Sequence, residues 1–279
     1  MNKGYIKIAL ALLSVAGFMQ NIAFADDSGS SPPKHKENVP LPPSPEEAKQ
    51  AADVMAEALA IAQKHAQKSE DYKLYSKEDD GAILYFKKIN ETEIGKLDLI
   101  IPNADSYADI VNMIWDPNGA KNFDSTFIEG NLPQVYNENL VIIQQRYKSA
   151  IGSWQRYYHA LANKVELSKD ETAILLASSD MNDHDGHCTR KYINPIVESA
   201  NSFKPDINSQ EDIRKGELSK MYVNLVAFFI KKGEDNVKIT YISSIDPNVP
   251  WYVPGAVIKK ALVKKFINMI QLRDIFKKK

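Results

Sequence analysis

The segment from Met221 to Ile230 constrains the fold of this chain more than any other feature. Its residues read Met-Tyr-Val-Asn-Leu-Val-Ala-Phe-Phe-Ile, so apolar side chains fall on both faces of an extended strand. Such a strand needs cover on both sides, either from packed elements or, on one side, from the wall of an apolar cavity. The segment therefore predicts the centre of a sheet whose two faces are both covered.

Helical patterns flank a series of strand patterns. A helix is predicted to begin at Ser44-Pro45-Glu46-Glu47, where a capping serine, a proline and a glutamate stand in the order of a capping box. Strand patterns cover 72–75, 83–89, 96–101, 140–149, 154–167, 172–179, 218–231 and 237–245, with helices expected at 106–115, 120–123 and 254–276. This order predicts an α+β fold, a strongly curved antiparallel sheet with a long C-terminal helix packed across it.

The first 45 residues are predicted to lie outside the folded domain, which we expect over 46–279. Residues 1–25 combine two lysines, an apolar run and the small-x-small end Ala23-Phe24-Ala25, as a secretory signal peptide does. The apolar run is too short for a spanning helix, which needs roughly 20 residues. Residues 26–45 hold six of the 14 prolines and are typical of an extended linker. We therefore expect a secreted protein.

Charge is distributed unevenly along the chain. The formal net charge is −1, from 35 basic and 36 acidic residues, which argues against a uniformly basic nucleic-acid binder. Residues 254–279 carry eight basic residues and one acidic residue, a net charge of +7, whereas 26–253 carry 25 basic and 35 acidic residues, a net charge of −10. The single cysteine, Cys188, excludes an internal disulfide framework and a four-cysteine zinc site.

The C-terminal helix has a broad apolar face. That face includes Val257, Ile258, Leu262, Phe266 and Met269, and the basic residues expected largely opposite are Lys259, Lys260, Lys264, Lys265 and Arg273. One interpretation is an ordinary core-packing helix with a solvated back. The other is a lid over a hydrophobic cavity whose lysines meet an anionic membrane. The two interpretations are compatible.

The stretch from Asp180 to Cys188 contains side chains that can bind metals. Read as a calcium loop it places Tyr192 where a glutamate is required, and read as a zinc site it lacks a second ligand cluster. We therefore predict no metal site and a polar turn. The sequence also lacks G-x-S-x-G, P-loop and H-E-x-x-H motifs, so we expect neither an enzyme nor a cofactor.

Two arginines lie in strand patterns rich in aromatic residues. Arg146 and Arg156 either face solvent or point into a cavity and hold a phosphate or carboxylate, with aromatic rings around a quaternary ammonium. The period of two places Trp154, Arg156 and Tyr158 on one face. That face is the first candidate for a head-group site.

Three motifs resemble those of START (StAR-related lipid-transfer) domains. Trp115-Asp116-Pro117-Asn118 resembles the family's W-[DN]-P motif, and 152–158 stands where its R-D-[FY]-V strand lies. The segment 240–251, followed by an amphipathic helix, resembles its T-Y-…-D-P-…-P-x-W ending. The resemblance covers about 46–279. It implies a helix-grip fold enclosing a tunnel for one lipid, with Tyr241 and Trp251 among the candidate ligand-binding residues.

The whole chain, with its signal and linker, is similar to the fam-a family of malaria parasites. This resemblance implies binding and transfer of a phospholipid, phosphatidylcholine first. We also expect a monomer whose basic C-terminal helix touches anionic membranes transiently. It also implies the parasitophorous vacuole or the host red cell as the compartment, although no R-x-L-x-[EQD] export signal follows residue 25.

The chain departs from the START pattern at two places. Tyr157 replaces the aspartate of the R-D pair, and the segment from Asp246 to Trp251 is shorter than the usual ending. An alternative function also stays open: a secreted adhesion or structural module that uses the same fold with its tunnel filled by side chains.

Overall fold

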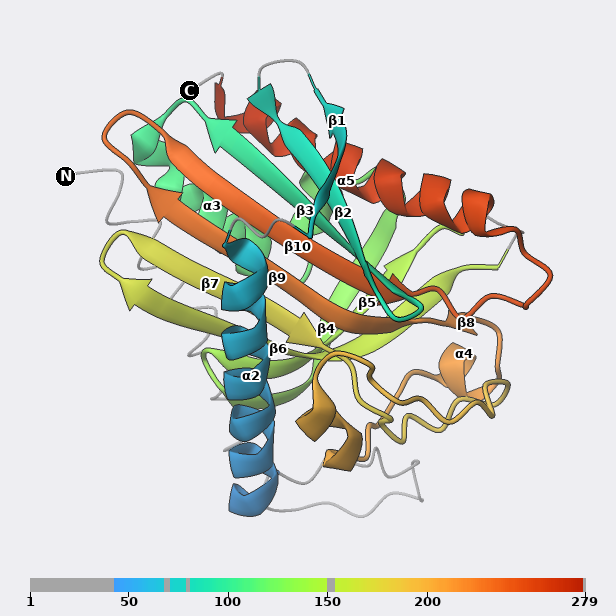
Figure 1. Cartoon of the computed structure of the whole chain (residues 1–279). Coiled ribbons are helices and arrows are strands. Elements are labelled where there is room, and N and C mark those ends of the chain that lie inside the picture. The colour runs from blue at the N-terminus through green and yellow to red at the C-terminus, as the bar shows by residue number, and fades with distance from the viewer. Residues whose placement is uncertain (1–42, 68–70, 79–80, 150–153, 278–279) are drawn as a thin grey trace, which may run out of the picture. The chain divides into compact units, whose positions relative to one another are not determined.

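The structure is a computed structural model that describes residues 43–67, 71–78, 81–149 and 154–277 (Figure 1). The predicted signal peptide, most of the predicted linker, the predicted turn at 79–80 and the motif residues 152–153 lie outside the described residues. The described residues belong to the unit Pro42–Lys279.

Ten strands of the described residues form one sheet. They are β1 (Lys73–Lys77), β2 (Ile83–Ile89), β3 (Thr92–Ile101), β4 (Phe127–Asn137), β5 (Leu140–Tyr147), β6 (Arg156–Ser168), β7 (Glu171–Ala177), β8 (Ser219–Lys220), β9 (Tyr222–Lys232) and β10 (Val237–Asp246). Their order is β1-β2-β3-β10-β9-β7-β6-β5-β4, with antiparallel neighbours throughout, and the short β8 pairs in parallel with β6. The sequence did not predict β4, because Gly130, Asn131 and Pro133 interrupt its strand pattern.

Four α-helices and three short 3₁₀ helices accompany the sheet in the described residues. They are α2 (Pro45–Ala66), η2 (Ala104–Ser106), α3 (Tyr107–Trp115), η3 (Gly119–Asn122), η4 (Glu198–Ser202), α4 (Glu211–Arg214) and α5 (Gly255–Lys277). The predicted cap of α2 is confirmed: the Ser44 hydroxyl accepts a hydrogen bond from the Glu47 amide at 3.1 Å, and Pro45 is the first helical residue.

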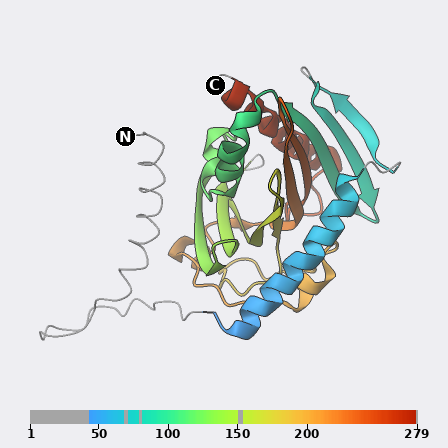
Figure 2. The same cartoon turned by 90° about the vertical axis from the view of Figure 1, so that its left-hand side faces the viewer.

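The two faces of the sheet carry separate apolar clusters. We call the face covered by α2 the outer face, where Ala51, Val54 and Met55 pack against side chains such as Leu175. The face covered by α3 and α5 is the inner face, where residues of both helices pack against the other side of the same strands. Figure 2 shows α2 on one side of the sheet and α3 and α5 on the other.

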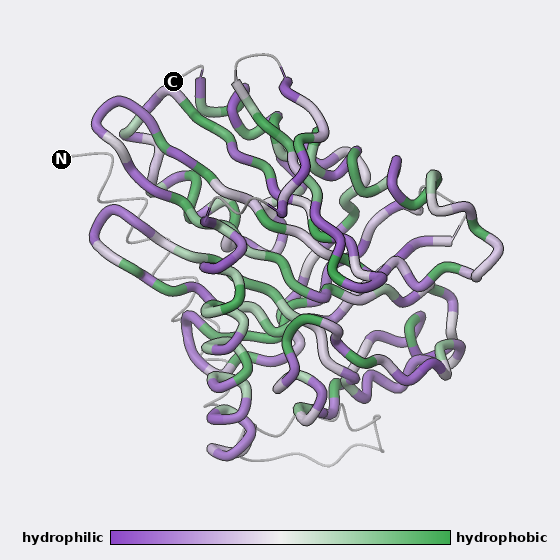
Figure 3. Tube along the Cα trace, viewed as in Figure 1, coloured by the Kyte–Doolittle hydropathy of each residue, from purple (hydrophilic) through white to green (hydrophobic). Residues whose placement is uncertain are grey.

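The central strand β9 is covered on both sides, as its sequence predicts. All residues from Tyr222 to Ile230 are buried. Phe228 belongs to the inner cluster and Phe229 to the outer one, so neither face of the strand meets water. In Figure 3 apolar residues follow the central strands, and hydrophilic residues gather in the turns that join β6 to β7 and β9 to β10.

Within the described residues, no helix combines the length and the apolar character needed to cross a membrane.

Candidate functional site

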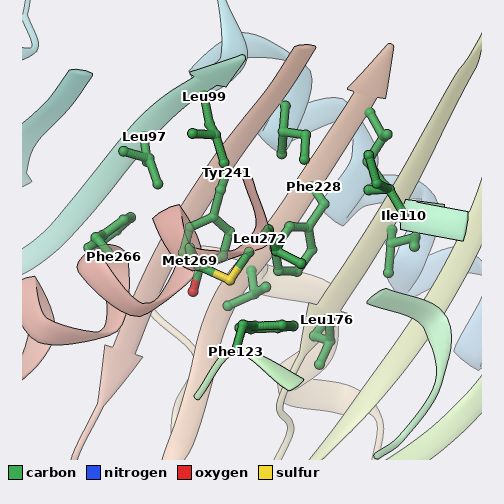
Figure 4. Close-up of a cluster of buried hydrophobic side chains, with 14 of the residues drawn as sticks. Leu97, Leu99, Ile110, Phe123, Leu176, Phe228, Tyr241, Phe266, Met269 and Leu272 are labelled. Carbon is green, nitrogen blue, oxygen red and sulfur yellow. The ribbon is translucent and has the colours of Figure 1, made fainter. Parts of the chain in front are cut away.

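The inner face holds a continuous apolar cluster beneath α5. Phe266, Met269 and Leu272 of α5 are buried against Tyr241 and Phe228 of the sheet (Figure 4). The rings of Phe266 and Tyr241 lie 5.1 Å apart between centroids, and those of Phe228 and Tyr241 lie 4.6 Å apart. These side chains meet across the space between helix and sheet, which is therefore packed in this structure.

Gly95 of β3 allows α5 to lie this close. A Cβ atom at this position would overlap the ring of Phe266 and touch Phe86. The Phe86 ring stands edge-on to Phe266 at 5.7 Å. The absence of a side chain at Gly95 thus forms the seat into which Phe266 packs.

A polar group lies on the inner face at β5 and β6. The Gln145 side-chain oxygen accepts hydrogen bonds from the hydroxyls of Tyr147, at 2.8 Å, and of Tyr158, and its amide nitrogen donates to the Pro117 carbonyl at 2.8 Å. Burial raises the pKa of both tyrosines above its ordinary value, so both hydroxyls stay neutral donors. Tyr147 was among the aromatic residues expected beside Arg146, whereas Gln145 was not predicted. The pairing of Gln145 with Tyr158 across β5 and β6 is the signal that indicates it.

A second polar group joins α5 to the segment after η3. The Lys265 ammonium binds the Asp124 carboxylate at 2.6 Å, and Asn268 donates to the same carboxylate at 2.9 Å. Burial alone would raise the pKa of Asp124, but the charge of Lys265 and hydrogen bonds from Lys265 and Thr126 outweigh it and lower that pKa. Burial lowers the pKa of Lys265 despite its partner. These residues tie the middle of the helix to the domain.

The expectation that the basic residues of α5 lie opposite its packed face was wrong for three of the five. Lys259 binds the Glu93 carboxylate with its ammonium 3.2 Å from the Phe86 ring centroid, Lys265 pairs with Asp124, and Arg273 is buried. Charge patterning could not show this, because the acidic partners come from distant parts of the chain. Lys260 and Lys264 are exposed.

The residues predicted for a lid helix divide into two groups. Phe266 and Met269 are buried, and Leu262 is half-buried against the inner cluster. Nearer the helix start Ile258 is half-buried, while Val257 is 42% exposed. The C-terminal half of α5 is therefore embedded in the inner face, whereas its first turns lie at the surface.

The three residues expected on one strand face do not lie together. Tyr158 belongs to the inner cluster. Arg156 is half-buried and donates to the Pro247 carbonyl at 2.5 Å and to the Ser149 hydroxyl at 3.2 Å, which ties β6 to the segment after β10. Trp154 precedes β6 and is 52% exposed. The period of two does not extend to Trp154, because the strand begins only at Arg156.

Arg146 lies on the outer face and not in the inner cluster. Its sequence neighbours along β5 are on the inner face: Tyr147 packs against the inner cluster, and Gln145 bonds Tyr158 of that cluster. Alternation along the strand therefore turns Arg146 away from the inner face. Its guanidinium binds Asp212 at 2.5 Å and 2.8 Å and Glu129 at 3.2 Å. The placement expected for Arg146 at a tunnel is therefore corrected: its charge is used in ion pairs on the opposite side of the sheet.

The last two predicted residues have opposite surroundings. Tyr241 lies at the centre of the inner cluster, where burial raises its pKa to about 12. Trp251 is 95% exposed in the segment between β10 and α5, next to Tyr252, which is 69% exposed. Two large aromatic side chains thus face solvent directly before the helix that covers the inner face.

The stretch from Asp180 to Cys188 forms part of a buried ionic network on the outer side. The Asp183 carboxylate binds the Lys220 ammonium at 2.7 Å and accepts from the Tyr157 hydroxyl and from His159, both at 3.0 Å. Burial alone would raise the pKa of Asp183, but His159 and Lys220 lower it. Among the described residues no group of three or more His, Cys, Asp or Glu side chains is arranged to hold a metal ion.

Surface hollows lie at the edges of the sheet in the described part of the chain. One of 240 Å³ lies between α3 and the β6–β7 hairpin, with Tyr107, Val111 and Lys164 among its walls. Another, of 390 Å³, is lined by Trp154, Gln155, Asp212, Glu217 and Leu218. No buried member of the inner cluster lines either hollow.

Comparison with known structures identifies the fold. The chain is similar to human StAR-related lipid transfer protein 5, with a TM-score of 0.60, 11% identity, and coverage of 83% of this chain and 98% of that one. It is also similar to human STARD10, with a TM-score of 0.55, 14% identity, and coverage of 86% and 82%. The lipid transfer and protein localization domain of human StarD13 is similar with a TM-score of 0.50 and 13% identity, over 77% of this chain and 94% of that one. The predicted α+β helix-grip fold of START domains is confirmed.

The sequence itself matches no protein-family model and no curated protein. At identities of 9 to 14% the structural similarity shows the fold, and the function has to be argued from the site.

Proposed function

We propose that this protein binds one amphiphilic lipid between the inner face and α5 and carries it between membranes, with phosphatidylcholine as the first candidate. The observation that carries the proposal is the inner cluster itself: an extended apolar surface covered by α3 and by the long C-terminal helix α5. Two structural neighbours that share the fold are named for lipid transfer: human StAR-related lipid transfer protein 5 and the lipid transfer and protein localization domain of human StarD13. Burying acyl chains there stabilises the complex by about 0.8 kcal/mol per methylene.

The polar group at Gln145 is the proposed site of the lipid head group. Its two tyrosine partners offer hydroxyls that can turn from Gln145 to a phosphate or ester oxygen. Arg156, two residues before Tyr158 on β6, would add its positive charge to this site by releasing the Pro247 carbonyl and the Ser149 hydroxyl. No covalent step is needed, so the proposal requires neither catalytic residues nor a cofactor.

Loading requires that α5 move away from the sheet. The rings of Phe266 and Tyr241 now occupy the space an acyl chain would take, and displacing Phe266 from its seat at Gly95 opens that space. The ion pairs of Lys259 and Lys265 must part as the helix moves.

We propose that the aromatic pair before α5 makes the membrane contact. Trp251 and Tyr252 are amphipathic rings suited to the membrane interface, and both are exposed. Lys260 and Lys264, exposed on the helix that follows, add attraction to anionic lipids. Insertion of this segment would pull on the first turns of α5 and so couple membrane contact to opening.

The route and the compartment remain proposals carried by the sequence. A signal peptide over 1–25 would send the protein into the secretory pathway. The similarity to fam-a proteins suggests the parasitophorous vacuole or the host red cell as its destination.

The test is transfer of fluorescent phosphatidylcholine between vesicles. We expect transfer by the native protein and a clear loss in Tyr158→Phe, which removes only the hydroxyl that contacts Gln145. Tyr136→Phe is the matched control, because its hydroxyl binds Glu47 at 2.6 Å and its ring packs with the outer cluster. Equal transfer by both variants would move the head-group site away from Gln145, and no transfer by the native protein would refute the carrier.

A second candidate is the secreted adhesion or structural module. The packed contacts of Phe266, Tyr241 and Phe228 favour it, because they fill the inner face without a ligand. This candidate predicts a stable protein that neither takes up nor transfers lipid.

A further inference from the structure

The hollow at Trp154 belongs to the outer side of the sheet and takes no part in the proposed lipid site. Its wall residue Asp212 pairs with Arg146 of the outer face, and Leu218 packs in a small cluster with Tyr157 and Ile213. The hollow has a volume of 390 Å³ and is open to solvent. The side chains that line the hollow determine which class of ligand it can bind.

The principal wall is an aromatic ring held in place. The Trp154 indole stacks on the His187 ring with centroids 6.2 Å apart and an interplanar angle of 27°, yet the residue is 52% exposed. The stacked partner fixes the orientation of the ring, and the exposed part borders the hollow. Among aromatic side chains, tryptophan is the best partner for a cation over its face.

The charges around the hollow have a negative balance. Asp212 and Glu217 line it, and the neighbouring cations are already used: Arg146 binds Asp212 and Glu129, and Lys215 binds Glu211 at 2.7 Å. Asp212 is thus offset by Arg146, whereas Glu217 forms no salt bridge with a described residue and leaves one uncompensated carboxylate at the hollow. An anion is therefore disfavoured here, and a cation is attracted.

The hydrogen-bonding capacity of the walls selects among cations. Both carboxylate oxygens of Asp212 are occupied, one by Arg146 and the other by Arg146 and the Ile213 amide. A cation with several N–H donors would find two free side-chain acceptors in the walls, the Glu217 carboxylate and the Gln155 amide oxygen, and its other donors would stay unpaired. A quaternary ammonium group has no donors to satisfy and binds through charge and aromatic contact alone.

We propose that this hollow binds a quaternary ammonium group, as carried by choline compounds, over the Trp154 ring and beside Glu217. The position of the hollow in the domain allows the quaternary ammonium group to come from a membrane or from solution. Asn248, in the segment that leads to Trp251, donates to the Lys220 carbonyl of β8 at 3.0 Å, so the hollow lies at the end of the domain that carries the proposed membrane contact (Figure 1). The ligand is therefore either a choline head group displayed by a membrane or a free choline compound.

The test is a titration of the ¹⁵N-labelled protein with tetramethylammonium chloride, with sodium chloride at equal ionic strength as the reference. The chain has three tryptophans, so the Trp154 indole signal can be assigned by substitution. We expect a saturable shift of that signal and of the Gln155 and Leu218 amides. Glu217→Gln should weaken binding about two- to fivefold, as expected for the loss of one exposed charge.

Two further variants distinguish the hollow from general electrostatics. Trp154→Leu should abolish the saturable shifts at Gln155 and Leu218. Glu166→Gln removes a carboxylate at the other hollow and should leave the binding constant unchanged. Shifts equal to those caused by sodium chloride, or an equal loss in the Glu166 variant, would overturn the proposal.

The source is then identified with two ligands. Phosphatidylcholine vesicles that broaden the Trp154 signal, where phosphatidylglycerol vesicles do not, would identify a membrane head group. A response to phosphocholine alone would identify a soluble compound. This site is independent of lipid carriage, since a protein that transfers no lipid could still bind tetramethylammonium, and a carrier could lack it.

Discussion

Addition of one methyl group at Gly95 tests how α5 is seated on the sheet. Gly95 lies inside β3 and is not among the glycines with positive φ, so alanine fits its backbone without strain. The new Cβ, however, would overlap the Phe266 ring, which must retreat by about 1 Å to restore ordinary contact. Gly95→Ala therefore probes the contact and not the backbone.

The magnitude follows from overpacking of a closed core. Inserting a methyl group into a well-packed site costs about 1–3 kcal/mol. At roughly 2–4 °C per kcal/mol for a domain of this size, the melting temperature should fall by about 2–12 °C. In a Phe266→Ala background the overlap with Phe266 is gone and only the 3.0 Å approach to Phe86 is left, which the ring can relieve by moving into the vacated space; alanine then relieves the roughly 0.5–1 kcal/mol that glycine costs inside a strand. Gly95→Ala should then be neutral or slightly stabilising.

The assay is a double-mutant cycle by urea unfolding of the native protein, the two single variants and the double variant. Phe266→Ala alone should cost about 3–5 kcal/mol, because Phe266 is fully buried. We expect a coupling free energy of about 1–3 kcal/mol between the two sites. Additive losses would refute the direct seating of Phe266 on Gly95.

Three other perturbations test separate parts of the account. The pKa of Asp124 is lowered in the folded state, so its pairing contributes stability above about pH 4 that is lost as the pH falls further. Asp124→Asn should remove that part of the acid dependence in unfolding curves measured from pH 6 to 2. An unchanged pH dependence would contradict the pairing of Asp124 with Lys265. Trp251→Ser should weaken vesicle binding without changing the melting temperature. Ile193→Ser, at a residue that is 67% exposed, should change neither vesicle binding nor the melting temperature. Equal loss of vesicle binding in the two variants would contradict the role of Trp251. Arg156→Ala should slow phospholipid transfer while the domain stays folded, and unchanged transfer would exclude Arg156.

The fold was predictable because its signals are local. The capping box at Ser44, the doubly apolar strand at 221–230 and the apolar face of the last helix each arise from adjacent residues. The strand β4 was missed because its residues lack a strand pattern and are held by pairing with β5, a contact that no local window contains.

The site was predictable only in part, for two physical reasons. Both faces of β5 are covered, so alternation shows that Arg146 and Gln145 point to opposite faces but not which face is the inner one. The partner of Lys265 lies 141 residues away, so the helical pattern alone places that lysine in solvent. Tyr158 and Tyr241, predicted to bind the ligand, lie in the inner cluster, and their contact with a ligand stays a prediction.

The central claim is that the inner face and α5 enclose one lipid. The most direct measurement is mass spectrometry of an organic extract of the purified protein, before and after incubation with mixed phospholipid vesicles and re-isolation. The account predicts close to one phospholipid per chain after incubation, enriched in phosphatidylcholine and reduced in Tyr158→Phe. A folded protein that yields no lipid before or after incubation would contradict the account, because its inner face would then stay filled by its own side chains.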